Sequence, residues 1–344
     1  MRRYLLFVSQ LYSLSILRPL QEAVRARGDE VAWFCEWDED EFLRRNERVL
    51  EDVAAVKAYA PDAVLVPGNW VPPLFPGIKV EVFHGFSVAK RSLERGHFRI
   101  RGFFDLYCTQ GPDTTPRFER LAREHGHFRV RETGWPKVDP LFRAEPAPFP
   151  VRGGRPVVLY ASTFTPRLTS TTHLFEAVKR MSEGGRWQWL VTFHPKMPRD
   201  IVDRYRALEG PNLKFVETDD IIPLYKAADV LLCDTSSAIS EFLLQHRPVV
   251  TFRNRRPQRY MIDVAEPEAV EPALERALTR PPEIMEAIRR YAEHIHPYRD
   301  GRSSERVLDA VEESLALGRE GLRRKPLNLW RRWQARRKLG YYGI

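Results

Sequence analysis

Cysteine is scarce in this sequence, which has three in 344 residues. Cys35, Cys108 and Cys233 are far apart, and each lies in or near an apolar run. Their spacing fits neither a disulfide framework nor a zinc site. Buried thiols of this kind are typical of a reducing compartment, so we expect a cytoplasmic protein.

Other common signals are also absent. No run approaches the roughly 18 consecutive apolar residues of a transmembrane helix. Polar residues interrupt the apolar N-terminal segment, which fits a buried strand better than a signal peptide. The fingerprints G-x-G-x-x-G and G-x-x-x-x-G-K-[ST] do not occur, which excludes the best-known dinucleotide and P-loop motifs.

Metal-ligand patterns are weak. The acidic triplet at 38–40 is better explained as the solvated start of a helix. Four histidines flank helix ends without the partner set of a zinc site: His125, His127, His294 and His296. The sequence therefore predicts no metal site.

The net charge of +9 is concentrated near the C-terminus. No acidic residue follows Glu320, whereas eight basic residues do: Arg323, Arg324, Lys325, Arg331, Arg332, Arg336, Arg337 and Lys338. Removing these eight from the 55 basic residues leaves 47, against 46 acidic ones. The body of the protein is thus nearly neutral and its C-terminal tail is basic.

Short apolar runs alternate with amphipathic segments along the chain. In the first half we predict strands at 4–9, 30–36, 61–68, 78–85 and 104–110, and helices at 17–28, 39–60 and 116–126. In the second half we predict strands at 157–163, 187–195, 212–217, 229–233 and 248–254, and helices at 173–184, 198–210, 221–228, 238–246, 267–295 and 303–318. Such alternation is typical of α/β proteins with doubly wound parallel sheets.

A segment rich in proline and glycine separates the two halves. We predict a Rossmann-like domain at 1–143, a linker at 144–156, a second Rossmann-like domain at 157–318 and a basic tail at 319–344. Ligands of open parallel sheets bind beyond the carboxyl ends of the strands. The residues that follow the strands are therefore the candidates for a site in a cleft between the two domains.

The richest of these segments follows the strand that ends at Cys233. Asp234, Thr235, Ser236 and Ser237 precede a helix, and hydroxyl groups at a helix N-terminus, together with its free N–H groups, favour a bound anion. Helix capping alone is the alternative, but one capping residue would suffice for it. We therefore predict a phosphate site here.

Two further loops of the second half carry candidates. "TFHPK" ends a strand with His194 and supplies Lys196 as a point charge for a phosphate. "YASTFTPRLTS" adds Thr163 and Arg167. Each loop taken alone could also be an ordinary solvated connection.

In the first half, "IKVEVFHGF" ends a strand with His84 and Gly85. An imidazole titrates near neutral pH and can take a proton from a hydroxyl group, while glycine leaves room for a ligand. A loop histidine that caps a neighbouring group is the alternative.

Taken in order, these motifs resemble the CDP-glycerol glycerophosphotransferase family, GT-B-type enzymes that make teichoic-acid-like polymers. The matching stretches are "VFHGFSVAKR", "TGWPKVDPLF", "LYASTFTPR", "TFHPK", "IPLYKAADVLLCDTSSAISEFLLQHRPVVTF" and "YRDGRSSERVLDAV". The resemblance implies metal-independent transfer of glycerol phosphate from CDP-glycerol, with no cofactor besides that donor substrate, to a polymer or lipid-linked acceptor.

The resemblance also implies roles for individual residues. His84 would deprotonate the acceptor, His194 would bind or protonate the donor pyrophosphate, and Ser236 with Ser237 would hold its phosphates. Gly85 and Lys90 would belong to the acceptor loop. Where the family usually has His-Gly-Thr, this chain has Phe86 after Gly85, so its acceptor loop is expected to differ.

A second enzyme class stays open. Glu241 lies one turn into the helix after the serines, where nucleotide-sugar enzymes commonly hold the ribose hydroxyls with a carboxylate. Segments around it also resemble UDP-GlcNAc 2-epimerases. A GT-B glycosyltransferase or epimerase that uses a UDP-sugar is therefore the alternative function.

The tail at 321–344 interleaves Leu327, Leu329, Trp330 and Trp333 with its basic residues. A basic amphipathic helix with tryptophans is typical of a membrane-surface anchor, so we expect peripheral binding to the anionic inner face of the plasma membrane. The alternatives are a disordered solubilising tail and a nucleic-acid-binding segment, and we expect no nucleic acid partner. A non-enzymatic binding protein for lipid or nucleic acid is the remaining class.

Overall fold

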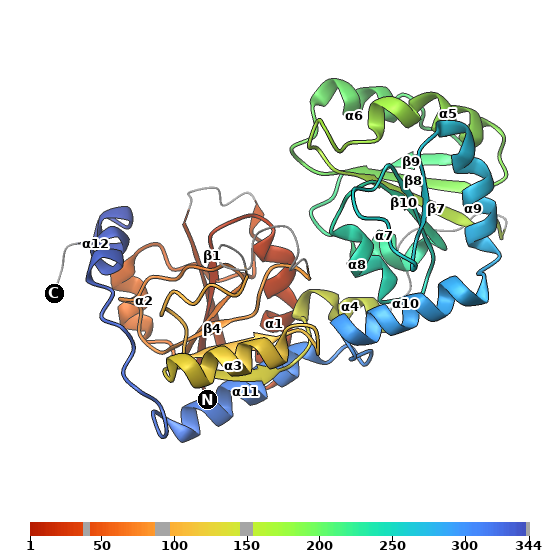
Figure 1. Cartoon of the computed structure of the whole chain (residues 1–344). Coiled ribbons are helices and arrows are strands. Elements are labelled where there is room, and N and C mark those ends of the chain that lie inside the picture. Colours follow the sequence, from red (N-terminus) through yellow and green to blue (C-terminus); the bar gives the residue numbers. More distant parts are fainter. Residues whose placement is uncertain (37–41, 87–96, 145–153, 342–344) are drawn as a thin grey trace. The chain divides into compact units, whose positions relative to one another are not determined.

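The computed structural model describes residues 1–36, 42–86, 97–144 and 154–341. They divide into two compact units (Figure 1). Unit 1 consists of residues 1–140 and 295–344, and unit 2 consists of residues 141–294. Each unit contains one six-stranded sheet in which all the paired strands are parallel. The predicted α/β class with two Rossmann-like domains is confirmed.

The sheet of unit 1 has the strand order β2-β1-β3-β4-β5-β6. Its strands are β1 (Arg3–Val8), β2 (Glu30–Cys35), β3 (Ala63–Val66), β4 (Ile78–Glu81), β5 (Leu106–Thr109) and β6 (Arg129–Glu132). Its helices are α1 (Ser13–Ala26), α2 (Val53–Tyr59), α3 (Thr115–His125), the 3₁₀ turn η2 (Pro136–Val138), α11 (Ser303–Leu317) and α12 (Leu329–Lys338). The short α4 (Asp139–Phe142) joins the two units.

The sheet of unit 2 has the order β12-β11-β10-β7-β8-β9. Its strands are β7 (Val157–Ser162), β8 (Gln188–Phe193), β9 (Leu213–Phe215), β10 (Val230–Cys233), β11 (Val249–Phe252) and β12 (Ile262–Val264). Its helices are α5 (Thr171–Glu183), α6 (Arg199–Arg206), α7 (Ile222–Ala227), α8 (Ala238–Leu243), the 3₁₀ turn η3 (Pro267–Ala269), α9 (Val270–Leu278) and α10 (Pro282–Ile295).

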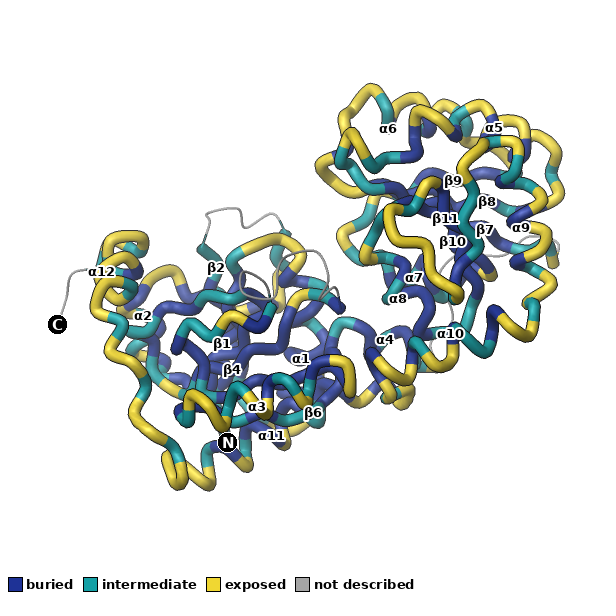
Figure 2. Tube along the Cα trace, viewed as in Figure 1, coloured by how far each residue is buried: buried dark blue, intermediate teal, exposed yellow. Residues whose placement is uncertain are grey.

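The central strands form the two cores, as their continuous apolar runs predict. Every residue of β3, β5, β7, β10 and β11 is buried, and Figure 2 shows the buried trace along the middle of each sheet. The edge strands β6 and β12 were not predicted, because both are short and carry polar residues. Strand ends near the sheet centre are consequently fixed by packing on both faces.

The helix predicted at 39–60 is wrong over most of its length. Residues 42–52 contain no α-helix, and α2 begins only at Val53. Asp52 caps it, since its Oδ1 accepts a 2.7 Å hydrogen bond from the N–H of Ala55. Before that cap the backbone runs beside β2, where Leu50 donates to the carbonyl of Trp33. Residues 37–41, including the acidic triplet, lie outside the described ranges.

The C-terminal helical segment joins unit 1 and not the second domain, to which the predicted boundaries assigned residues 295–318. Asp139 explains the difference. Its buried carboxylate accepts hydrogen bonds from the N–H groups of Ser303 (2.8 Å) and Ser304 (2.7 Å), which start α11. Gly134, with φ of +81°, lets Ser303 approach closely, because a Cβ there would lie 2.5 Å from Ser303 Oγ.

Candidate functional site

In unit 2, the polar loops predicted from the sequence lie along one edge of the sheet. The loops follow β7, β8 and β10, which are neighbours in the order β10-β7-β8. Parallel strands end at the same edge, so these loops meet there. The predicted residues Thr163, Arg167, His194, Lys196 and Ser236 are thereby brought to one side of unit 2.

Asp234 holds two of these loops together. Its carboxylate is fully buried and accepts hydrogen bonds from Ser162 Oγ (2.5 Å), Thr163 N–H (3.1 Å) and Ser170 Oγ (3.1 Å). The N–H of Ser170 also donates to it at 3.1 Å. Burial raises the pKa of Asp234, and these donors offset part of that rise. Asp234 was predicted to bind phosphate, but its oxygens instead organise the loop after β7.

His194 is exposed at the end of β8. Its Nδ1 accepts a 3.1 Å hydrogen bond from the N–H of Lys196, so Nε2 carries the proton of the neutral ring. Burial and the nearby Lys196 ammonium lower the pKa of His194. The ring lies 4.4 Å from that of Phe164, centroid to centroid. Phe164 thus links the β7 loop to a neutral histidine that can donate a hydrogen bond.

The serine loop after β10 has divided roles. Ser236 Oγ accepts from the N–H of Ala238, the first residue of α8, at 3.2 Å, so this hydroxyl group is engaged in the turn that starts the helix. Ser237 is exposed at the start of α8. Thr235 Oγ1 accepts from the backbone N–H of Arg255 at 3.1 Å. That bond brings an arginine-rich loop to the serines.

This arginine loop was missed by the sequence reasoning. It connects β11 to β12 and contains Arg253, Arg255, Arg256 and Arg259, all exposed. Four arginines within seven residues after a strand were the available signal. The loop adds positive charge beside the hydroxyl groups of the serine loop, which is where an anionic ligand gains most from it.

Glu241, predicted to hold ribose hydroxyls, is buried in α8. The hydroxyl of the buried Tyr225 hydrogen-bonds to its carboxylate, and burial raises the pKa of Tyr225 well above its usual value. Glu241 therefore serves the packing of α8 against α7.

In unit 1, an unusual backbone turn presents His84. Phe83, which is buried, has φ of +61° just after β4, a left-handed conformation that is costly for an aromatic residue. Its carbonyl accepts from Trp135 Nε1 at 3.1 Å. The exposed His84 ring donates from Nδ1 to the carbonyl of Pro67 at 3.2 Å. Nε2 is then the unprotonated nitrogen of the neutral ring.

Two titratable groups near His84 were not predicted. Glu81, the last residue of β4, is buried, and burial raises its pKa well above the usual value while Arg101 opposes the rise. Burial and the neighbouring His84 lower the pKa of His97 to about 4. The rings of His84 and His97 are 6.4 Å apart. Burial therefore disfavours the charged forms of both side chains.

Of the two residues predicted for the acceptor loop, the structure describes only one. Gly85 is half-buried, with open space around its Cα. Lys90 lies outside the described residues. Phe86 is buried and packs edge-on against Trp135, at 4.9 Å between centroids. The departure from the family's His-Gly-Thr pattern thus serves the core of unit 1.

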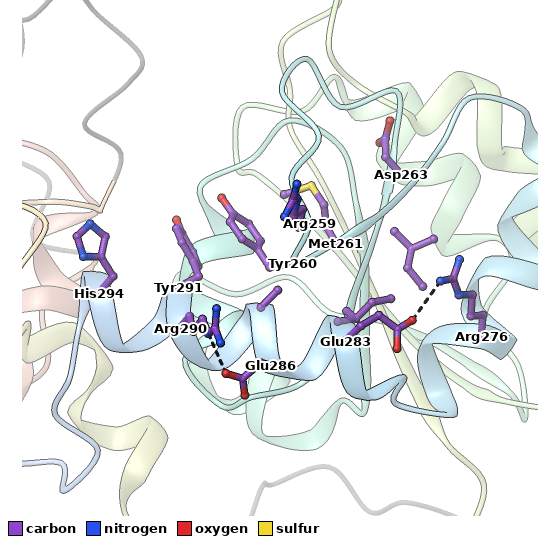
Figure 3. Close-up of a pocket in the computed structure, with 13 residues that line it drawn as sticks. Arg259, Tyr260, Met261, Asp263, Arg276, Glu283, Glu286, Arg290, Tyr291 and His294 are labelled. Carbon is purple, nitrogen blue, oxygen red and sulfur yellow. Dashed lines mark hydrogen bonds and ion pairs between the residues drawn. The ribbon is translucent and has the colours of Figure 1, made fainter.

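A cavity of about 950 Å³ lies in unit 2 between α10 and the segment that leads into β12 (Figure 3). Tyr260 and Tyr291 stack in it at 4.0 Å, and Tyr291 shares a 2.7 Å hydrogen bond with Ser240 of α8. None of the predicted site residues lines it. Among the described residues, no group of three or more acidic, histidine or cysteine side chains could hold a metal ion.

Two units that each carry a six-stranded parallel Rossmann-type sheet are the architecture of the GT-B fold. The fold is similar to that of the wall teichoic acid polymerase TagF, with 15% identity and a TM-score of 0.67 over 92% of this chain and 90% of that chain. It is also similar to S. aureus MnaA in complex with UDP, with 15% identity and a TM-score of 0.65 over 95% and 99% of the two chains.

A sequence comparison matches part of the chain to a family model. Residues 99–258 match the family model of CDP-Glycerol:Poly(glycerophosphate) glycerophosphotransferase, which confirms the resemblance recognised in the motifs. No curated protein matches the chain.

Proposed function

We propose that the protein transfers glycerol phosphate from CDP-glycerol to an acceptor hydroxyl group and releases CMP. The observation that carries this proposal is the match of residues 99–258 to the glycerophosphotransferase family. The similarity in fold to TagF, a wall teichoic acid polymerase, supports an acceptor of the teichoic acid type, linked to a lipid or a cell-surface polymer.

In this reaction the acceptor oxygen attacks the phosphorus that bears glycerol. The bond from that phosphorus to the CMP oxygen breaks, and CMP leaves with the electron pair. The acceptor proton goes to His84 Nε2, because the bond from Nδ1 to Pro67 fixes the tautomer that has its lone pair at Nε2.

The donor pyrophosphate is assigned to the polar edge of unit 2. His194 donates from Nε2 to a phosphate oxygen or protonates the departing CMP, since its Nδ1 is occupied as an acceptor. Lys196, Arg255 and the hydroxyl group of Ser237 supply charge and hydrogen bonds. Fixed groups of this kind stabilise the charge that develops on the transferring phosphoryl group.

Release of CMP from CDP-glycerol tests the reaction. Loss of a general base lowers turnover by about 10²–10⁴-fold, so His84→Ala is expected to fall in this range. His125→Ala, which removes an exposed histidine from α3 of the same unit, is the matched control and should retain full turnover. Undiminished turnover in His84→Ala would refute the base assignment, and no CMP from the wild type would refute the reaction.

A donor screen separates the second candidate function. The similarity in fold to MnaA, whose structure contains UDP, favours testing UDP-sugars beside CDP- and GDP-linked donors by thermal shift. We expect a selective shift with CDP-glycerol, and a selective shift with a UDP-sugar would favour an epimerase or glycosyltransferase. We also propose transfer without a resident metal, and therefore expect EDTA to leave turnover unchanged.

A further inference from the structure

The tail of unit 1 exposes a concentration of apolar side chains. Eight large hydrophobic residues are exposed in the part of the chain that the structure describes, and four of them lie between 327 and 333. The exposed fractions are 68% for Leu327, 68% for Leu329, 66% for Trp330 and 47% for Trp333. The two tryptophan rings stack on each other at 4.8 Å. All four side chains are thus exposed to solvent over about half of their surface or more.

The opposite side of the tail is fixed to unit 1. Lys325 Nζ forms a 2.6 Å ion pair with Asp105, and Asn328 Nδ2 donates to the carbonyl of Arg101 at 3.1 Å. Ala335, in the middle of α12, is buried. Figure 1 shows α12 beside α2, and Lys57 of α2 donates to Tyr341 Oη at 2.8 Å. The exposure of the tryptophans is therefore a property of a docked helix.

Positive charge surrounds the apolar surface. Arg332 and Arg337 are exposed on α12, and the guanidinium of Arg337 lies 5.6 Å from the Trp333 ring centroid. No acidic residue follows Glu320. An anionic lipid interface accepts indole rings, aliphatic side chains and guanidinium groups together. A nucleic acid backbone would use the arginines and leave the leucines in water.

The helix also ends near the sheet edge that carries His84. Lys338 pairs with Glu36 at 2.9 Å, and its ammonium lies 4.6 Å from the Trp70 ring centroid. Glu36 directly follows β2, and Trp70 lies in the segment after β3. His84 follows β4 at the same edge of this parallel sheet.

We propose that α12, with Leu327, Leu329, Trp330 and Trp333, is a pre-docked binding surface for anionic phospholipid membranes. It holds unit 1 at the lipid surface with the carboxyl edge of its sheet close by. The inference is independent of the proposed reaction, because it rests on the tail alone.

Co-sedimentation with phosphatidylglycerol and phosphatidylcholine vesicles tests the proposal on the full chain. Each basic residue near an anionic surface contributes roughly fivefold to partitioning, so Arg332→Gln/Arg337→Gln should bind phosphatidylglycerol vesicles about 25-fold more weakly. Arg120→Gln/Arg123→Gln on α3 removes the same charge from exposed positions of the same unit and should bind like the wild type. Trp330→Ser/Trp333→Ser should lose binding and its tryptophan blue shift.

Three results would overturn the proposal. They are no binding of the wild type to phosphatidylglycerol vesicles, equal losses in the two arginine pairs, and binding to duplex DNA that the tail variants abolish while vesicle binding persists. CMP release with a soluble acceptor, measured without vesicles, should be unchanged in all tail variants. Failure of the membrane proposal and failure of the reaction are thereby distinguished.

Discussion

Substitution of Asp234 by asparagine should loosen the loop after β7. The carboxylate accepts hydrogen bonds from four donors. Ser162 Oγ, Ser170 N–H and Ser170 Oγ donate to Oδ2, and the N–H of Thr163 is shared between both oxygens. In asparagine, one carboxylate oxygen is replaced by an NH₂ group, which is itself a donor. It cannot accept a hydrogen bond from the serine and threonine donors that it then faces. A lost hydrogen bond to a charged acceptor costs about 1.5–3 kcal/mol, and a buried donor left unsatisfied costs about 1–3 kcal/mol.

Part of this loss is offset, because asparagine removes the cost of burying a charge, a cost also visible in the raised pKa of Asp234. We expect a net loss of about 2 kcal/mol in the free energy of unfolding. For a unit of about 150 residues this lowers Tm by roughly 4–8 °C. Binding of the donor should weaken as well, since Phe164 of this loop packs against the ring of His194.

Thermal unfolding of the full chain, followed by circular dichroism, and titration with CDP-glycerol measure both effects. Asp200→Asn, at an exposed position in the first turn of α6, is the control and should unfold like the wild type. An unchanged Tm with weakened donor binding in Asp234→Asn would refute the reasoning. It would return Asp234 to the role of a direct phosphate ligand.

Three further substitutions test the roles of charged or titratable side chains. Lys196→Met removes the cation that lowers the pKa of His194, so the pKa should rise in an NMR titration of the ring protons; no rise would exclude the Coulombic cause. Burial lowers the pKa of His296 to about 4 in the folded protein. As the pH falls, His296 is therefore protonated in the unfolded chain before it is protonated in the folded one. The contribution of His296 to the free energy of unfolding should then fall by about 2 kcal/mol between pH 7 and 5. In urea titrations, stability should therefore fall less steeply with pH in His296→Gln than in the wild type. Arg255→Gln should weaken donor binding several-fold and leave Tm unchanged. Titration calorimetry measures the binding and scanning calorimetry measures Tm.

The parts of the fold predictable from sequence were those with a local cause. Apolar runs such as the one ending at Cys233 predicted buried parallel strands, and polar residues after them predicted the edge at which the loops meet. Pairing between distant residues had no local signal. Asp234 looked like one member of a polar run, although its partners lie 64–72 residues away. Asp139 likewise gave no sign that it would hold Ser303 and Ser304.

The turn that carries His84 shows why local reasoning stops short of the site. A left-handed conformation costs roughly 1–2 kcal/mol for a residue other than glycine. The residues around Phe83 give no sequence signal for such a conformation. The cost is met by burial of the Phe83 ring, which stacks on His97 at 4.5 Å and packs against Phe118 at 5.1 Å. Because the backbone turns at Phe83, the next side chain leaves the core and reaches the carbonyl of Pro67. The tautomer of His84, and hence its fitness as a base, therefore depends on aromatic packing beneath it and not only on the His-Gly pair.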